Sequence, residues 1–382
     1  MTNQPLRVLN VTTVLRAAGI ESFIMNMYRH MDRDQVQYDF MVMRNEKEYY
    51  DNEICKLGGR KYTISVPFNN TLIRIIIESF MLYFFLRKNK YRIVHIHATT
   101  SLRAFYLLAA KMAGVPVRIY HSHSAYVSGK SSVKLRIYQW CRSHITRWAT
   151  DYFACSTAAA EWVFDSHIIS QKKYELMPNG IDVDKFRFNQ LSRNEIRQEL
   201  NINDDFVVAH TGRFLDQKNH SFLIDVFSEI HVQNPNSRLL LLGTGELVKS
   251  IQQKVDRLGL SDRVIFLGVR SDVDKILSSA DCYVMPSLYE GLPVAAVEAE
   301  CSGLPCFLSD NITKEVALTS KTYFLPLNLG AKQWAQYVYQ HSSDSLRHDE
   351  SEVIAEHGYD VKEVASKLQS FYQFSVSKNS RR

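Results

Sequence analysis

Thirteen short runs rich in Val, Ile and Phe alternate with longer stretches of helical periodicity along the whole chain. Short apolar runs bounded by turn residues are typical of buried strands, and their alternation with helices indicates parallel sheets covered on both faces. Seven runs fall in the first half and six in the second, so we predict two doubly wound α/β domains. The predicted strands cover residues 7–11, 38–42, 61–64, 93–97, 117–120, 152–155, 174–177, 206–211, 238–242, 264–267, 282–285, 305–308 and 323–325.

The border between the two predicted domains lies at residues 178–186, where a turn-forming Asn-Gly pair follows a strand. We expect an N-terminal domain of residues 1–183 and a C-terminal domain of residues 184–360. A last helix at about residues 361–376 is too short to be a domain and is expected to pack on one of the two. Open sheets of this kind bind ligands at the carboxyl ends of their strands, so we expect a cleft lined by those ends.

Charge is distributed unevenly between the halves. Residues 1–185 carry 25 Lys and Arg against 15 Asp and Glu, a net charge of +10, and residues 186–382 carry 21 against 25, a net charge of −4. A basic half suits an anionic partner, which can be nucleic acid, a phosphorylated substrate or an anionic membrane surface, although a solvated basic surface is the simpler alternative.

Two segments raise the question of membrane contact. The longest apolar run, residues 71–86, is interrupted by Arg74 and Glu78 and falls short of the roughly 20 uncharged residues that a spanning helix needs. We expect a buried or half-buried helix there. Residues 133–148 mix aromatic and basic side chains, which suits either a helix on lipid headgroups or an ordinary surface helix.

The number of cysteines and the N-terminal sequence indicate in which cellular compartment the protein is expected. The six cysteines are too few for a disulfide scaffold and show no zinc-binding spacing. The opening residues run directly into a strand pattern and lack the features of a signal peptide. A reducing, cytoplasmic location is therefore expected.

The most informative segment is residues 287–305, SLYEGLPVAAVEAECSGLP. Pro293 stands where a first helical residue belongs, and a glycine fits just past the helix end. The free amide groups around residues 291–294 lie at the positive end of this helix and suit a phosphate. Glu290 can accept a hydrogen bond from a sugar hydroxyl, and Glu298 can hold a ribose diol. An acid and base pair of a glycosidase is the alternative, but it leaves the helix start unexplained.

A second candidate segment follows the strand at residues 206–211. Gly212 lets the backbone approach a ligand, and Arg213 and Lys218 place two cations beside it. Two cations that face a diphosphate can offset the charge of this leaving group without a metal. The alternative is a basic loop that leads into a helix, and the independent phosphate signal of residues 291–294 favours the diphosphate.

A third segment, LLGTGE at residues 241–246, ends a strand and opens a helix as a dinucleotide fingerprint does. Val248 occupies the place of the third glycine, which disfavours a hydride-transferring enzyme. A glycine turn that borders a nucleotide or a sugar stays open as an interpretation.

Four histidines, His95, His97, His121 and His123, lie in or after two strands of the first half. Alternation along a strand puts both members of each pair on one face. His121 can stand at a strand end, where a catalytic histidine belongs. Because no carboxylates accompany them in the sequence, we expect no metal site.

Taken together, these segments resemble glycosyltransferase family 4, the retaining enzymes of the GT-B fold. The segments VRIYHSHS and GRFLDQKNH are most similar to bacterial exopolysaccharide and capsule transferases. The residues that carry the resemblance are Gly212-Arg213, Lys218-Asn219-His220, residues 242–246, Phe266-Leu267-Gly268, residues 290–298, Gly303-Leu304-Pro305, Ala154-Cys155-Ser156 and residues 178–182.

The resemblance implies roles for single residues. Arg213 and Lys218 grip the donor diphosphate, Glu290 contacts the transferred sugar, and His121, with His123 as its rival, lies near that sugar. The implied catalytic residues are Arg213, Lys218, Glu290 and His121. The implied donor-binding residues are Gly19, Gly212, Gly243, Gly268, Arg270, Gly291, Leu292, Pro293, Val294 and Glu298, with the base against residues 268–270, the ribose on Glu298, and Ala18 in place of the family's second glycine beside Gly19.

The resemblance also implies a reaction. A hexose or N-acetylhexosamine passes from a nucleotide diphosphate sugar, expected to be a UDP-sugar, to a saccharide on a polyprenyl diphosphate, with retained configuration and without a metal or cofactor. The basic first half then docks on the inner face of the cell membrane and binds no nucleic acid. Two alternatives have the same shape: a non-hydrolysing nucleotide-sugar epimerase, and a non-catalytic subunit that binds sugar nucleotides.

Overall fold

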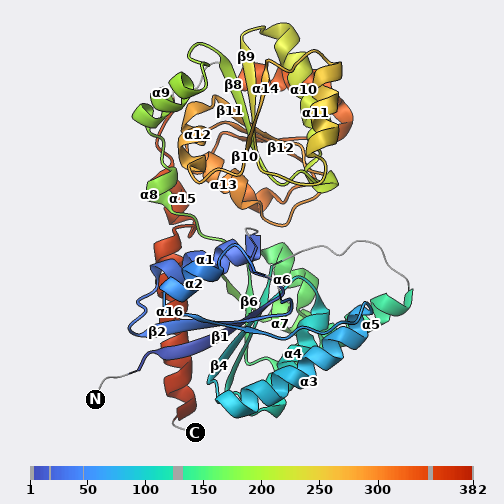
Figure 1. Cartoon of the computed structure of the whole chain (residues 1–382), viewed down its shortest axis with the longest axis vertical. Coiled ribbons are helices and arrows are strands. Elements are labelled where there is room, and N and C mark those ends of the chain that lie inside the picture. The colour runs from blue at the N-terminus through green and yellow to red at the C-terminus, as the bar shows by residue number, and fades with distance from the viewer. Residues whose placement is uncertain (1–3, 17–18, 46, 124–131, 343–346, 381–382) are drawn as a thin grey trace. The chain divides into compact units, whose positions relative to one another are not determined.

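The computed structural model describes residues 4–16, 19–45, 47–123, 132–342 and 347–380 (Figure 1). The chain divides into two compact units: the first is Met1–Gly180 with Val361–Arg382, and the second is Ile181–Asp360. Each unit contains a parallel sheet with helices on both faces, which confirms the predicted pair of doubly wound α/β domains.

The sheet of the first unit has the strand order β3-β2-β1-β4-β5-β6-β7. Apolar side chains from α3, α4, α5 and α6 cover one of its faces, and side chains from α1, α2 and α16 cover the other. Its strands are β1 Leu6–Thr12, β2 Val36–Val42, β3 Arg60–Thr63, β4 Ile93–Ala98, β5 Val117–Ser122, β6 Asp151–Ala154 and β7 Glu175–Leu176. Its helices are α1 Gly19–His30, α2 Asp51–Lys56, α3 Thr71–Asn89, α4 Ala104–Met112, α5 Ser132–Trp148, α6 Thr157–Val163, α7 Ser166–Ser170 and α16 Val361–Ser380.

The sheet of the second unit has the order β10-β9-β8-β11-β12-β13. Helices α10, α11 and α14 supply the core on one face, and α8, α9, α12, α13 and α15 supply it on the other. Its strands are β8 Phe206–Thr211, β9 Ser237–Leu242, β10 Val264–Gly268, β11 Cys282–Met285, β12 Cys306–Ser309 and β13 Thr322–Leu325. Its helices are α8 Val183–Phe186, α9 Gln190–Glu199, α10 His220–Gln233, α11 Val248–Arg257, α12 Val273–Ser279, α13 Val294–Cys301, α14 Ala331–Ser342 and α15 Ser351–Glu356.

All thirteen predicted strands are present, and they leave a switch point in each sheet. The order of the strands reverses between β1 and β4 in the first sheet and between β8 and β11 in the second. Ligands of doubly wound folds bind outside the carboxyl ends of the strands at such points. The predicted site segments that follow β8 and β11 therefore lie side by side at the switch point of the second sheet.

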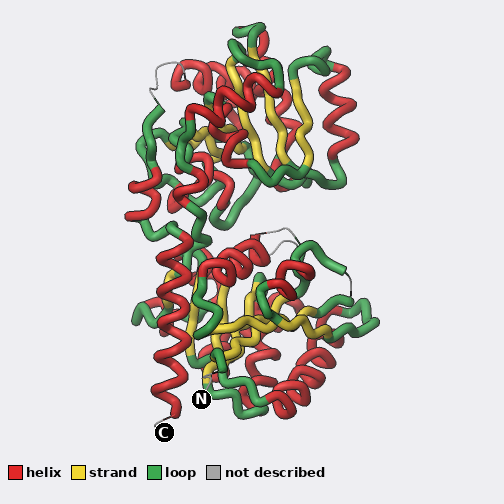
Figure 2. The backbone as a smooth tube through the Cα atoms, turned by 60° about the vertical axis from the view of Figure 1, so that its left-hand side comes forward, coloured by secondary structure: helices red, strands yellow, loops and turns green. Residues whose placement is uncertain are grey.

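The final helix belongs to the first unit. Helix α16 packs against α1 (Figure 2), and its side chains Val364, Leu368 and Tyr372 are buried in the core between them. The Tyr372 hydroxyl lies 3.2 Å from the hydroxyl of Tyr38 on β2. The C-terminal helix thus packs on the sheet formed by the N-terminal part of the chain.

The apolar run of residues 71–86 forms most of α3. The Asn70 side chain accepts hydrogen bonds from the Leu72 and Ile73 amides and caps the helix. Leu82 and Leu86 are buried, whereas Phe80 on the opposite side is exposed, which confirms the expected half-buried helix. None of the described helices combines the length and the apolarity needed to cross a bilayer.

Candidate functional site

Three glycines follow three neighbouring strands of the second sheet. Gly212, Gly243 and Gly268 stand at the ends of β8, β9 and β10. The Gly212 amide donates to the Leu242 carbonyl over 2.9 Å, and the Gly243 amide donates to the Gly268 carbonyl over 2.7 Å. Gly243 has a φ of +129°, and a Cβ there would lie 2.1 Å from the Gly212 oxygen. Backbone therefore packs directly on backbone, and no side chain fits at Gly243.

Lys218 and Glu290 form an ion pair beside this turn. The Lys218 stem passes over Gly212, where an added Cβ would lie 3.3 Å from its Cδ and Cε atoms. Its Nζ lies 2.7 Å from Oε1 of Glu290, and both side chains are largely buried. Gln217 Nε2 donates to the other carboxylate oxygen, Oε2, over 3.2 Å. The Glu290 carboxylate is thus held at both oxygens.

Hydrogen bonds tie the loop after β8 to the loop after β11. The Leu288 amide donates to the Gln217 carbonyl over 2.8 Å, and Gln217 Nε2 donates to the Tyr289 carbonyl over 3.0 Å. Asn219, which has a φ of +53°, donates its side-chain amide to the Pro286 carbonyl over 3.2 Å. Sequence reasoning missed Gln217, for which the only signal was its place next to Lys218.

The helix of the 287–305 segment is present as α13, but Pro293 was misplaced by one position. It has an extended ψ of 105° and precedes the first helical residue, Val294, so it occupies the N-cap rather than the first helical position. Its carbonyl accepts from the Ala296 amide over 3.0 Å. A helix start leaves the amides of its first residues without partners in the helix, here those of Val294 and Ala295. Gly291 and Leu292 lead into this start.

Arg213 and Arg270 differ in their surroundings. Arg213 is exposed, and no described carboxylate forms an ion pair with it. The Arg270 guanidinium is held by Asp272 over 2.7 and 2.8 Å, and it also reaches Glu199 at 3.3 Å. Arg213 is thus exposed and outside the ion pairs of the described residues, whereas Arg270 is engaged in the turn after β10.

Glu298 lies on the second turn of α13 and is half-buried. Burial raises the pKa of its carboxyl to about 7, the charge of Asp274 adds to the rise, and Lys185 opposes it. The carboxylate is ionised above this pH and protonated below it. The ionised form is the one that accepts hydrogen bonds from a ribose diol, the role that the resemblance implies for Glu298.

Ionisation of Glu298 should show in the pH dependence of donor binding. The KM for the nucleotide-sugar donor should fall as pH rises from about 6 to about 8, because Glu298 ionises in this range. Glu298→Gln should raise KM and remove the dependence. Initial-rate kinetics on both proteins measure this, and an identical pH profile in the variant would remove Glu298 from the donor site.

His95, His97, His121 and His123 form one stacked cluster on β4 and at the carboxyl end of β5. The rings of His95 and His97 lie 4.1 Å apart, and those of His121 and His123 lie 4.0 Å apart, which confirms that each pair shares a face. His95 Nε2 lies 3.2 Å from His121 Nδ1, and His97 Nδ1 lies 3.0 Å from His123 Nε2.

Other side chains close the cluster. The Tyr372 hydroxyl lies 2.7 Å from His95 Nδ1, and Asn10 Oδ1 lies 3.0 Å from His97 Nε2. Two ring nitrogens, His121 Nε2 and His123 Nδ1, are buried without a hydrogen-bond partner among the described residues. The backbone of Met177 lies next to the His121 ring, and the sugar contact of either histidine stays a prediction. His121 is fully buried and His123 is half-buried.

Burial keeps these imidazoles neutral. It lowers the pKa of His95, His97 and His121 well below the usual value and that of His123 to about 3. Ring nitrogens of the first three lie within 4.8 Å of one another, close enough to hold one cation. The described group contains no carboxylate, and its nitrogens already contact each other. Metal independence stays a prediction.

The second pH prediction concerns the stability of this cluster. Unfolded histidines titrate near 6.5, whereas the folded cluster resists protonation, so the unfolded chain binds more protons at acid pH. The free energy of unfolding should be maximal above about pH 6.5. Below it, each histidine should remove up to about 1.4 kcal/mol per pH unit.

Urea unfolding at about pH 7.5 and about pH 5.5 measures this loss. His123→Gln removes one of the titrating groups and should make the fall shallower. An unfolding midpoint that stays constant between the two conditions would contradict the neutral cluster.

Gly19 opens α1 after the carboxyl end of β1. It is exposed, and an added Cβ would meet nothing within 4 Å, so packing alone does not require a glycine there. Ala18 lies outside the described residues. Gly19 thus lies at the carboxyl edge of the first sheet, the edge at which doubly wound folds bind ligands, and its role at the donor stays a prediction.

Comparisons with known proteins cover both units. The family model "Glycosyltransferase Family 4" matches residues 17–185, and "Glycosyl transferases group 1" matches residues 192–361. The EpsF protein of Bacillus subtilis (strain 168) is 33% identical over 393 residues, with all of both chains covered. The chain belongs to glycosyltransferase family 4.

Two further likenesses extend this assignment. The family 4 transferase is 30% identical, over 71% of its own length and 74% of the relative's, to a UDP-Gal:alpha-D-GlcNAc-diphosphoundecaprenol alpha-1,3-galactosyltransferase of Escherichia coli. Its fold matches the crystal structure of Anabaena HepE in complex with UDP and glucose, with a TM-score of 0.75, 18% identity and coverage of 96% and 99%. The fold is GT-B.

Proposed function

We propose that the protein is a retaining transferase that moves a hexose or N-acetylhexosamine from a UDP-sugar to a lipid-linked saccharide in extracellular or capsular polysaccharide synthesis. The observation that carries this is the Lys218–Glu290 pair, held beside Gly212. The related galactosyltransferase of Escherichia coli, whose name gives a UDP-galactose donor and a diphosphoundecaprenol-linked acceptor, supports the substrate classes.

The second unit binds the donor in this proposal. Arg213, Lys218 and the amides at the start of α13 are the groups that suit the diphosphate. Lys218 exchanges the Glu290 carboxylate for phosphate oxygens when the donor enters, and Gln217 keeps Glu290 oriented toward the sugar. Because these groups already offset the charge on the leaving diphosphate, the reaction needs no metal.

The first unit binds the acceptor and contributes a neutral histidine. His121 or His123 hydrogen-bonds the transferred sugar through its unpartnered nitrogen. The sugar leaves through an oxocarbenium-like state, and the departing phosphate accepts the proton of the attacking hydroxyl on the same face. The enzyme works in the cytoplasm at the anionic inner face of the membrane and takes no nucleic acid.

The test is transfer from radiolabelled UDP-sugars to a diphosphoundecaprenol-linked monosaccharide. We expect one donor to label the lipid, and only when the acceptor is present. Isomerised nucleotide sugar without any acceptor would replace the transferase with an epimerase. Donor binding without turnover of any tested donor would leave a non-catalytic binding subunit instead.

A further inference from the structure

Helix α3 carries apolar side chains on its outer side as well as on its core side. Ile73, Ile76, Phe80 and Phe84 follow one another at helical spacing, and we name these four the outer stripe. Their side chains are 47%, 49%, 63% and 54% exposed. A contiguous exposed apolar stripe on a surface helix marks an interaction site.

The part of the sequence that contains α3 is strongly basic. Between residues 54 and 150 the chain has sixteen Lys and Arg but a single carboxylate, Glu78. Glu78 is buried on the core side of α3, where it pairs with Arg74 at 3.6 Å and lies 4.0 Å from Arg103. The one carboxylate of this stretch therefore lies on the core side of α3 and not on its outer side.

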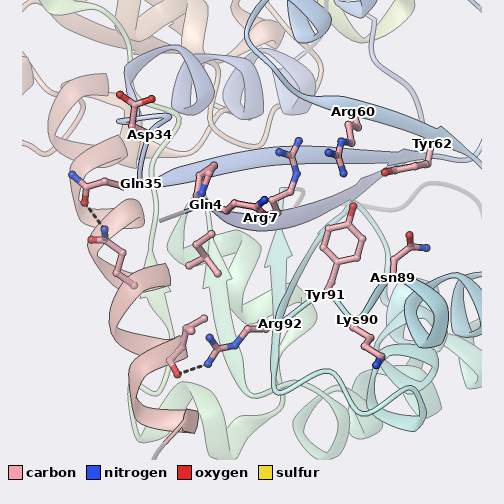
Figure 3. A pocket seen from close by; sticks show the side chains of 14 residues that line it. Gln4, Arg7, Asp34, Gln35, Arg60, Tyr62, Asn89, Lys90, Tyr91 and Arg92 are labelled. Atoms are coloured by element: carbon pink, nitrogen blue, oxygen red, sulfur yellow. Dashed lines mark hydrogen bonds between the residues drawn. The ribbon is translucent and has the colours of Figure 1, made fainter. Parts of the chain in front are cut away.

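Basic residues gather where the outer stripe ends. Arg87 and Lys88 are exposed on the last turn of α3, and Lys90 follows as its C-cap. Beyond them is a hollow of about 690 Å³ at the amino-terminal ends of β1, β3 and β4, the sheet edge opposite the predicted ligand edge. Figure 3 shows Arg60, Lys90 and Arg92 among the side chains that line it, together with one carboxylate, Asp34.

We propose that the outer stripe and the basic end of α3 form a surface that docks on an anionic phospholipid bilayer. Apolar side chains of a helix that lies in the interface enter the acyl boundary, and basic residues beside them attract anionic headgroups. A second copy of this chain suits the surface poorly, because it would bring two strongly positive faces together. The inference rests on the proposed function only in that a lipid-linked acceptor requires the enzyme at a membrane.

The test is cosedimentation with phosphatidylcholine vesicles, with and without phosphatidylglycerol. We expect wild-type protein to pellet with the anionic vesicles only and to be released at high salt. The double variant Phe80→Ser/Phe84→Ser should bind at least tenfold more weakly because it loses two apolar contacts with the acyl region. The affinity of Arg87→Glu/Lys88→Glu for the anionic vesicles should also fall at least tenfold, because its charge is reversed.

Matched controls lie on other surfaces. Phe374→Ser on α16 removes a phenylalanine of similar exposure, 66%, and Lys249→Glu on α11 reverses an exposed lysine. Both should bind vesicles like wild type. The proposal would be overturned if wild-type protein did not bind anionic vesicles, or if the outer-stripe variants bound them as tightly as wild type. It would also be overturned if light scattering showed that the wild-type protein is a dimer and that only the outer-stripe substitutions dissociate it.

Transferase activity separates this inference from the proposed function. The outer-stripe variants should retain turnover on a water-soluble, short-chain acceptor, because α3 contributes no residue to the candidate site. Vesicle binding by a wild-type protein that transfers no sugar would refute the proposed function and leave the docking surface intact.

Discussion

Lys218→Ala is expected to lower kcat by about two to three orders of magnitude while the protein stays folded. In the proposed donor complex, the ammonium group lies where charge develops on the departing diphosphate, and a cation in that place stabilises the transition state more than the bound ground state. The neighbouring Gln217 still holds Glu290 in the variant, so the loop after β11 should keep its position.

This prediction is tested by steady-state kinetics, with Lys249→Ala as the matched control variant. Lys249 is an exposed lysine on α11, and its removal should leave kcat unchanged. Circular dichroism should show that both variants are folded. Turnover of the Lys218 variant within a few-fold of wild type would remove this residue from leaving-group stabilisation.

Gly243→Ala is expected to destabilise the second unit by about 3 kcal/mol or more and to abolish donor binding. Its φ of +129° is strained for alanine, and the new Cβ would lie 2.1 Å from the Gly212 oxygen. The clash involves backbone on both sides, so relief requires the turns after β8 and β9 to separate. That separation moves Gly212 and the adjoining Lys218 away from the predicted phosphate position.

Gly259→Ala is the control, because Gly259 also has a positive φ, +68°, but open space around its Cβ position. It should cost only about 1–2 kcal/mol, the strain of the backbone conformation itself. Urea unfolding of both variants gives the comparison. An equal loss in the free energy of unfolding for the two variants would show that the close approach of Gly243 and Gly212 does not contribute to stability.

The strands could be predicted because their cause is local. Strands such as β11 and β12 are buried on both faces, so their sequences read as short apolar runs between turns. The helix start at Pro293 was predicted to within one residue for a similar reason. Proline at the start of a helix and glycine just past its end, here Gly303, are local signals of the helix limits. The structure places Pro293 at the N-cap, one residue before the predicted position.

The contacts that shape the candidate site could not be predicted, because they join distant residues. Gln217 meets Glu290 across 73 positions, since β8 and β11 are neighbours in the sheet although β9 and β10 separate them in the chain. Tyr372 reaches His95 across 277 positions, because the last helix returns to the first unit. Sequence motifs indicated which residues carry chemistry but not which residues orient them.

A crystal structure with the donor bound tests the central claim most directly. We predict that the diphosphate contacts Arg213, Lys218 and the amides of Val294 and Ala295, and that the sugar contacts Glu290. A nucleotide sugar bound to other residues, with the Lys218–Glu290 pair untouched, would contradict the account.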